Sequence, residues 1–92
     1  MPSKDAPNEA NLSQTVLKAL DILECIAMAE RPLSAAEVAK LCSLSRPTAY
    51  RLICTLAARG YLAQDDATHY RLGTQALSLT AFRSSRLKGK NL

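Results

Sequence analysis

The sequence predicts a small domain that is mainly α with a small β-hairpin: a winged helix-turn-helix with a three-helix core plus wing, followed by a linker helix. The first observation is a pair of helical patterns within residues 34–59, joined by a short turn. The second is the two-faced character of the later helix, which is apolar on one side and basic and polar on the other. The third is a hairpin pattern directly after that helix, at the place of a wing.

Residues 1–12 are expected to form a flexible N-terminal arm, because they are polar, contain two prolines and lack apolar periodicity. A first helix follows over residues 12–30, with Ser13 as its N-cap and Arg31-Pro32 at its end. Its predicted buried stripe has helical spacing: Val16, Leu20, Leu23, Ile26 and Ala27, widened by Leu17 and Met28. A stripe this wide has two interpretations. Either all of it packs in a large intramolecular core, or part of it forms a second surface that is buried in a homodimer.

The second helix is predicted to begin at Ser34, because the segment from Ser34 to Glu37 matches a capping box. Its predicted buried face follows an i, i+3, i+4 pattern: Val38, Leu41 and Cys42. Ala39 is the small residue that two crossing helices need. Ser43 occupies the turn, where glycine is usual, so a left-handed backbone there would cost on the order of 1 kcal/mol.

The third helix is predicted over residues 45–59 and starts at Ser45 or Arg46. Pro47 is tolerated in a first helical turn and disfavours helical geometry in the residue before it, which leaves both starts open. The packed face of this helix is aliphatic: Ala49, Leu52, Ile53 and Leu56. The opposite face is predicted to be exposed: Pro47, Tyr50, Arg51, Cys54, Thr55 and Ala58, with Arg46 and Thr48 flanking the first turn.

A helix with such a face fits the major groove of B-DNA, where the N-terminal residues of a recognition helix reach the base edges. Arginine suits guanine O6 and N7, and the threonine methyl suits thymine. The candidates for reading or positioning in the groove are Arg46, Tyr50, Arg51 and Thr55. The alternative is an ordinary amphipathic helix pair whose outer face is only solvated.

Gly60 is predicted to end the third helix as a left-handed C-cap. Residues 61–64 and 69–72 then predict two strands around a polar loop of about four residues. Alternation places side chains on opposite faces of the hairpin: Leu62, Tyr70 and Leu72 on one, His69 and Arg71 on the other. Arg71, or less favourably His69, is the candidate wing contact to phosphate, whereas Asp65 and Asp66 would repel phosphate.

A final helix is predicted from Gly73-Thr74, with apolar residues that end at Phe82, and a basic segment follows it. The expected organisation is therefore an arm over residues 1–12, a DNA-binding domain over 13–73, and a linker helix with a basic tail over 74–92.

Composition excludes several classes of function. Twelve Lys and Arg against eight Asp and Glu give a net charge of +4, which suits a polyanionic partner. Three widely spaced cysteines and one histidine, without C-x-x-C, argue against a disulfide framework, a zinc site or an iron–sulfur cluster, and favour buried, reduced thiols in a cytoplasmic protein. No metal, cofactor or catalytic residue is predicted, because no nucleophile–base pair or phosphate-binding glycine loop occurs. No signal peptide or apolar run of 18 residues points to secretion or a membrane.

Several segments carry a family resemblance, in this order: Gln14–Glu24, Arg31-Pro-Leu-Ser, Glu37-Val-Ala, Leu44-Ser-Arg-Pro-Thr-Ala-Tyr-Arg-Leu, and Arg59-Gly-Tyr-Leu with Tyr70-Arg-Leu-Gly. In order and spacing they resemble the N-terminal winged helix-turn-helix of the IclR-type transcriptional regulators, over about residues 13–82. The resemblance implies a regulator that binds a palindromic operator in double-stranded DNA as a homodimer or tetramer, either as a repressor or as an activator.

The resemblance also implies which residues contact DNA: Lys18, Ser34, Ser43, Thr48 and Arg51. Pro47 stands where the family often has serine, and proline offers no hydroxyl. The family continues into an effector-binding domain that this sequence lacks, so the chain is expected to be a DNA-binding fragment or an unusually short protein without a small-molecule effector site. The predicted function is sequence-specific duplex binding. The alternative is a winged-helix protein-interaction module that binds no DNA and has an apolar recognition face.

Overall fold

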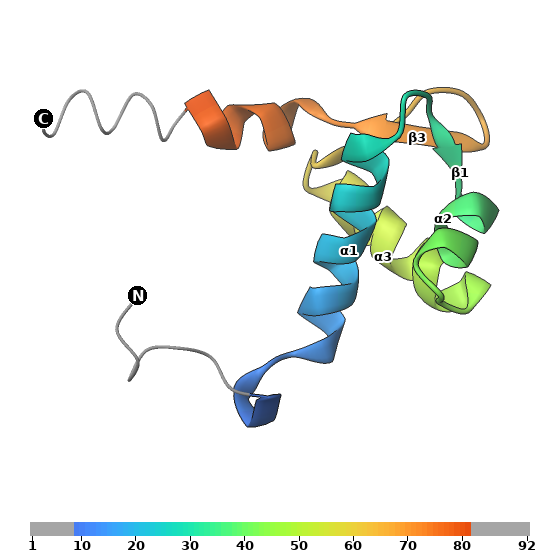
Figure 1. The fold of residues 1–92 in the computed structure, drawn as a ribbon. Coiled ribbons are helices and arrows are strands. Elements are labelled where there is room, and N and C mark those ends of the chain that lie inside the picture. Colours follow the sequence, from blue (N-terminus) through green and yellow to red (C-terminus); the bar gives the residue numbers. More distant parts are fainter. Residues whose placement is uncertain (1–8, 82–92) are drawn as a thin grey trace, which may run out of the picture.

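The computed structural model describes residues 9–81, and Figure 1 shows their arrangement. The helices are η2 (Glu9–Asn11), α1 (Gln14–Met28), α2 (Ala35–Leu41) and α3 (Arg46–Ala58), and residues 74–81 are also helical. The strands are β1 (Leu33–Ser34), β2 (Leu62–Gln64) and β3 (His69–Leu72). This is the predicted winged helix-turn-helix. Most of the expected arm, Phe82 and the basic tail lie outside the described residues.

The wing is a three-stranded antiparallel sheet in the order β1-β3-β2. The predicted hairpin is present, with Leu62 opposite Leu72 and Gln64 opposite Tyr70. The third strand, β1, was not predicted, and it pairs Ser34 with His69. Because Ser34 also caps α2, this short strand fixes the start of the helix-turn-helix against the wing.

The core lies where α1, α2, α3 and the sheet meet, and its buried members come from all of these elements: Ile22, Ile26, Leu33, Val38, Leu52, Ile53, Leu62 and Tyr70. The predicted stripe on α1 was wrong in part. Ile22 is fully buried, whereas Val16 and Leu20 are 54% and 45% exposed. The first half of α1 extends past the rest of the domain in Figure 1, so its apolar residues are only partly covered within the described residues.

Other members of the predicted apolar faces are also exposed. On α1 they are Leu17, Ala27 and Met28. On α2, Leu41 is 64% exposed, because this helix of 7 residues meets the core through Val38 and Ala39. Ala39 is therefore the small residue at the helix crossing, as predicted.

Each main helix begins at the predicted cap. The Ser13 hydroxyl accepts a hydrogen bond from the Val16 N–H (3.2 Å), and the Ser45 hydroxyl accepts one from the Thr48 N–H (3.2 Å). Ser45 is thus the N-cap of α3 and Arg46 its first helical residue, which decides between the two predicted starts.

The capping box of α2 is complete. The Ser34 hydroxyl accepts from the Glu37 N–H (3.1 Å), and the Ser34 N–H donates to Glu37 Oε1 (2.8 Å). The Arg31 guanidinium donates to both oxygens of the same carboxylate, at 3.2 and 2.8 Å. These hydrogen bonds, the one from Arg31 first, lower the pKa of Glu37 to about 2. The carboxylate is therefore ionised at neutral pH and ties the loop after α1 to the start of α2.

The turn between α2 and α3 is a Schellman motif with serine at the left-handed position. The Leu44 N–H donates to the Ala39 carbonyl (2.8 Å) and the Ser43 N–H to the Lys40 carbonyl (3.2 Å). Ser43 has φ 57°, as the turn required, and Gly60 has φ 82° in the matching motif at the end of α3. Only the first of these two positions carries a side chain.

Replacing Ser43 by glycine should therefore raise the free energy of unfolding by about 1 kcal/mol, because glycine adopts this backbone without the side-chain penalty. Urea denaturation measures the change. Ser43→Ala is the matched control and should bring no such gain, since alanine keeps the Cβ. A Ser43→Gly variant no more stable than the parent would contradict the strain assigned to this turn.

The helix over residues 74–81 is joined to the end of α3 by two backbone hydrogen bonds. The Gly73 N–H donates to the Tyr61 carbonyl (2.9 Å), and the Gln75 N–H donates to the Gly60 carbonyl (3.0 Å). The backbone passes so closely here that a Cβ on Gly73 would overlap the Gly60 carbonyl oxygen. None of the helices described over residues 9–81 is both long enough and apolar enough to cross a membrane.

Candidate nucleic-acid interface

The two faces of α3 are separated as the sequence predicts. Ala49 and Ile53 are fully buried, and Leu52 is nearly so. The opposite residues are all exposed and line one shallow surface: Pro47, Tyr50, Arg51, Cys54, Thr55 and Ala58. We call these six residues the outer face of α3. Because the aliphatic back anchors the helix, this outer face is held rigidly toward solvent.

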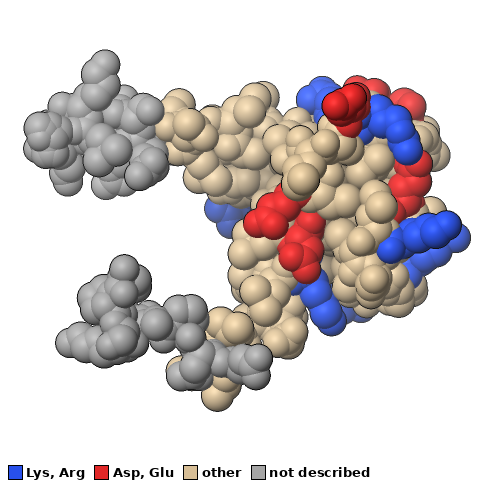
Figure 2. All heavy atoms as spheres, viewed as in Figure 1, with Lys and Arg blue, Asp and Glu red and all other residues tan. Residues whose placement is uncertain are grey.

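Charge is distributed unevenly over the described residues. Arg46 and Arg51 have no ion pair there, and α3 contains no acidic residue. In contrast, Arg31, His69 and Arg71 each contact a carboxylate: those of Glu37, Asp66 and Asp65. Figure 2 shows basic and acidic side chains together at the upper right, where the wing lies in the same view of Figure 1. The cations of α3 are thus available to an anionic partner, whereas those of the wing already contact carboxylates.

Two hydroxyls near this face are already used within the helix. The Thr55 hydroxyl donates to the Arg51 carbonyl (2.8 Å), and the Ser45 hydroxyl donates to Thr48 Oγ1 (2.9 Å). The Thr55 hydroxyl hydrogen is therefore not free for a base edge. Its remaining uses toward DNA are an accepted hydrogen bond or methyl contact with thymine.

Tyr50 and Cys54 are neighbours on the outer face. Hydrogen bonding to the Cys54 side chain raises the pKa of Tyr50 above its ordinary value, at which the hydroxyl is already protonated and can donate at neutral pH. Cys54 is exposed, and the prediction that all three thiols are buried was wrong for this residue. Cys25 and Cys42 are half-buried, and burial together with the Cys25 thiol raises the pKa of Cys42 to about 11.

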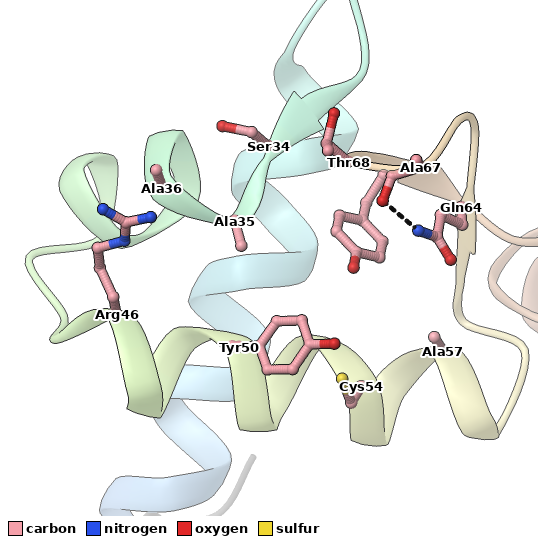
Figure 3. A pocket seen from close by; sticks show the side chains of 11 residues that line it. Ser34, Ala35, Ala36, Arg46, Tyr50, Cys54, Ala57, Gln64, Ala67 and Thr68 are labelled. Carbon is pink, nitrogen blue, oxygen red and sulfur yellow. Dashed lines mark hydrogen bonds between the residues drawn. The ribbon is translucent and has the colours of Figure 1, made fainter.

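A groove separates α3 from the wing, and Figure 3 shows it from close by. Its lining comes from the start of α2, from α3 and from one face of the hairpin: Ser34, Ala35, Ala36, Arg46, Tyr50, Cys54, Ala57, Gln64, Ala67, Thr68 and Tyr70. We call this the α3–wing groove. It brings together three predicted site residues, Ser34, Arg46 and Tyr50. Lys18 is half-exposed on α1 and Ser43 is exposed in the turn, and neither lines this groove.

Arg71 lies on the other face of the hairpin. Its Nε is 3.2 Å from Asp65 Oδ1, and it borders a hollow that Ile26 and Pro32 also line. His69 is on the same face, with Nδ1 3.2 Å from Asp66 Oδ1. The faces predicted for the two strands are therefore confirmed, but Arg71 does not share the α3–wing groove with Arg46.

Sequence reasoning did not select Gln64 or Thr68 as site residues, although both line the α3–wing groove. Gln64 pairs with Tyr70 across the hairpin, and Thr68 precedes Tyr70 by two residues. Since side chains alternate along a strand, Gln64 lies on the Tyr70 face. Strand alternation was thus the signal that could have found Gln64, whereas Thr68 precedes β3 and bonds through its hydroxyl to Asp66 and His69.

Comparison with known proteins identifies the domain. The model of the IclR helix-turn-helix domain matches residues 15–66, which is more than half of the 92 residues. A search of curated proteins found no match. Among the described residues, no group of three or more His, Cys, Asp or Glu side chains is placed to hold a metal ion.

Solved structures of regulators are similar in fold and sequence. An IclR family transcriptional regulator from Brucella abortus has a TM-score of 0.71 and 32% identity, over 77% of this chain and 27% of that one. A putative IclR regulator from Silicibacter sp. TM1040 gives 0.72 and 31%, over 80% and 30% of the two chains. The IclR protein of Thermotoga maritima gives 0.73 and 25%, over 78% and 29%.

The chain thus corresponds to less than a third of the length of each of these three regulators. The matching part is a helix-turn-helix rather than a catalytic domain, which agrees with the absence of enzyme motifs from the sequence. The exposed, basic outer face of α3 lies within the matched residues. The chain therefore belongs to the IclR family of transcriptional regulators and carries that family's helix-turn-helix DNA-binding domain.

Proposed function

We propose that this domain regulates transcription by binding a palindromic operator in double-stranded DNA, with α3 in the major groove. One observation carries the proposal: α3 presents Arg46 and Arg51 on its solvent side without a neighbouring carboxylate among the described residues. Such cations can neutralise phosphates and release the counterions condensed on a duplex, and a helix of this width fits the groove.

The proposed roles follow the position of each residue. Four residues enter or border the major groove: Arg46, Tyr50, Arg51 and Thr55. Lys18, Ser34 and Thr48 fix the register on phosphates, where hydroxyls and ammonium groups bind without reading sequence. Ser43 and Pro47 lie at the edge of the contact, in the turn and the first turn of α3.

Replacing Arg51 by alanine should weaken binding to the preferred duplex by about 1–3 kcal/mol and relax the preference at one base position. Selection of bound duplexes from a random library first provides the preferred sequence, and fluorescence anisotropy then gives the affinities. Lys18→Ala is the control, because loss of a phosphate contact should weaken all duplexes alike and flatten the salt dependence. Equal losses on preferred and random duplexes for Arg51→Ala would contradict a reading role.

The proposed homodimer forms through the first half of α1. That half carries three partly exposed apolar side chains, Val16, Leu17 and Leu20, and the exposed Leu12 lies just before the helix. Leu77 and Leu79 in the final helix are 64% and 52% exposed. Exposed apolar side chains favour a protein interface where they lie together, as Val16 and Leu20 do one turn apart on α1. Two copies of α3 would match the two halves of a palindrome.

Leu20→Glu should convert a dimer to a monomer, because the substitution places a charge in the apolar patch. Leu41→Glu is the matched control, since Leu41 is also exposed but lies on α2 outside the patch. Sedimentation equilibrium gives the mass of each variant. A parent chain that is monomeric at concentrations where it saturates the palindrome would contradict the dimer.

The alternative, a protein-interaction module that binds no DNA, predicts an apolar outer face on α3. The face combines apolar or weakly polar residues, Pro47, Cys54 and Ala58, with Arg51, Tyr50 and Thr55, and Arg46 lies beside it. Membership of a DNA-binding domain family supports the first function.

A further inference from the structure

The α3–wing groove differs from the back of the wing in its charge. Arg46 is the only Lys, Arg, Asp or Glu among its lining residues. Two carboxylates bond to lining residues without lining the groove themselves: Glu37 accepts from the Ser34 N–H and Asp66 from the Thr68 N–H. The hollow on the opposite side of the hairpin is lined by Arg31, Pro32, Asp65, Asp66 and His69. A phosphate entering that back hollow would meet two carboxylates, whereas a phosphate in the groove would meet a guanidinium and neutral polar groups.

The groove also offers hydrogen-bond donors that the wing holds in place. The Gln64 amide nitrogen donates one hydrogen to the Ala67 carbonyl (2.7 Å), and Figure 3 shows this bond beside the groove. The second amide hydrogen is left free, because each side-chain amide nitrogen carries two. The Tyr50 ring lies across the groove floor on α3, with its hydroxyl toward Cys54 (Figure 3).

Arg71 is placed differently. It is occupied by Asp65 Oδ1 (3.2 Å) and by the Leu72 carbonyl (3.3 Å), and it points to the face that does not border α3. A phosphate contact by Arg71 would have to replace these partners and bring DNA against Asp65. The sequence-based candidate for wing contact is therefore on the unfavourable side of the wing.

We propose that one sugar–phosphate strand of the bound duplex lies in the α3–wing groove, held by Arg46 from α3 and by Gln64 from the wing, and that Arg71 does not contact DNA. The inference rests on the proposed function, because it places the strand next to the major groove that α3 occupies. In this placement α3 enters a major groove, and one of the two backbones that border that groove passes between α3 and the wing. The groove is the surface that the fold offers to it.

Three substitutions test this placement, and each lowers the net charge by one: Arg46→Gln, Gln64→Glu and Arg71→Gln. The three variants therefore have the same net charge and the same long-range attraction to DNA. They differ only in where on the surface the charge is changed. Gln64→Ala is a fourth variant, which loses the bond to Ala67 without adding a charge. The probe is the duplex selected from the random library, titrated with the full chain at several KCl concentrations. Circular dichroism and urea denaturation confirm that each variant is folded.

Arg46→Gln should make the negative slope of log Kobs against log[KCl] less steep by about 0.9 for each protomer on the duplex, the value for one lost phosphate contact per protomer. Gln64→Glu should weaken binding by about tenfold or more, because a carboxylate would then face phosphate, and Gln64→Ala should cost less. Arg71→Gln should change the affinity by less than about twofold and should leave the salt slope unchanged within experimental error. This is the result expected of a cation that does not contact DNA.

Equal or larger losses for Arg71→Gln than for Gln64→Glu would overturn this placement while leaving duplex binding, and hence the proposed function, intact. An unchanged slope for Arg46→Gln would do the same. Failure of the parent chain to enrich or bind any duplex would remove the proposed function itself, and the placement of the strand with it.

Discussion

Gly73→Ala should lower the free energy of unfolding by about 3 kcal/mol, a large part of the stability of so small a domain. The new Cβ would overlap the carbonyl oxygen of Gly60 and would also approach the Leu62 backbone (3.1 Å to its carbonyl carbon). Both neighbours are backbone atoms, so they cannot swing aside as a side chain does. Relief requires movement of β3 or of the end of α3, at the cost of the hydrogen bond from Gly73 to Tyr61.

Gly60→Ala is the matched control for this prediction. At Gly60 the added Cβ would lie 3.2 Å from the Gln75 side chain, so the cost comes mainly from the positive φ of 82°. We expect about 1 kcal/mol there. Urea denaturation of both variants gives the comparison, and a Gly73→Ala variant no less stable than Gly60→Ala would contradict the close approach at this junction.

Ile22→Ala should cost about 3–4 kcal/mol, because Ile22 is fully buried where α1 meets the other helices and the sheet. The loss combines the transfer free energy of the removed methyl groups with the cavity left behind. Thermal or urea unfolding at low protein concentration measures it. The result also tests which face of α1 packs on the core.

Leu41→Ala serves as the comparison, since it removes a side chain of the same size from a residue that is 64% exposed. It should change stability by less than about 0.5 kcal/mol. The sequence prediction placed Leu41 in a buried face and omitted Ile22 from the buried stripe of α1. In the structure the opposite holds for both residues. Similar losses for both variants would mean that α1 and α2 are rotated relative to this structure.

Local chemistry made much of the fold predictable. Ser34, Ser45 and Gly60 act on backbone groups within a few residues of themselves, so their roles as caps depend little on the rest of the molecule. The faces of α3 were also predictable, because its large aliphatic residues lie on one side only. Both features are confirmed.

The orientation of α1 was not predictable in the same way. Leu20 and Ile22 are equally apolar, and the choice between them depends on where the neighbouring elements lie. Strand β1 has two residues and pairs with β3, far along the chain, so no local alternation reveals it. Such features come from tertiary packing rather than from propensity.

The candidate site was predictable where charge and helix face coincide, as at Arg46 and Arg51. Arg71 shows the limit of that reasoning, since its pairing with Asp65 depends on the register of the hairpin. Gln64 was overlooked because an uncharged residue in a short strand matches no binding motif. Its position becomes informative only when the wing is seen next to α3.

The backbone hydrogen bond from the Gln75 N–H to the Gly60 carbonyl couples the orientation of the final helix to that of α3. With 13 residues, α3 is about 20 Å long. If the two helices tilt together by about 10° around their junction, the opposite end of α3 travels about 3 Å, close to the rise of one base pair. Arg46 is at that far end, so a tilt of this size that overcame the packing of α3 on the core would move Arg46 by about the rise of one base pair.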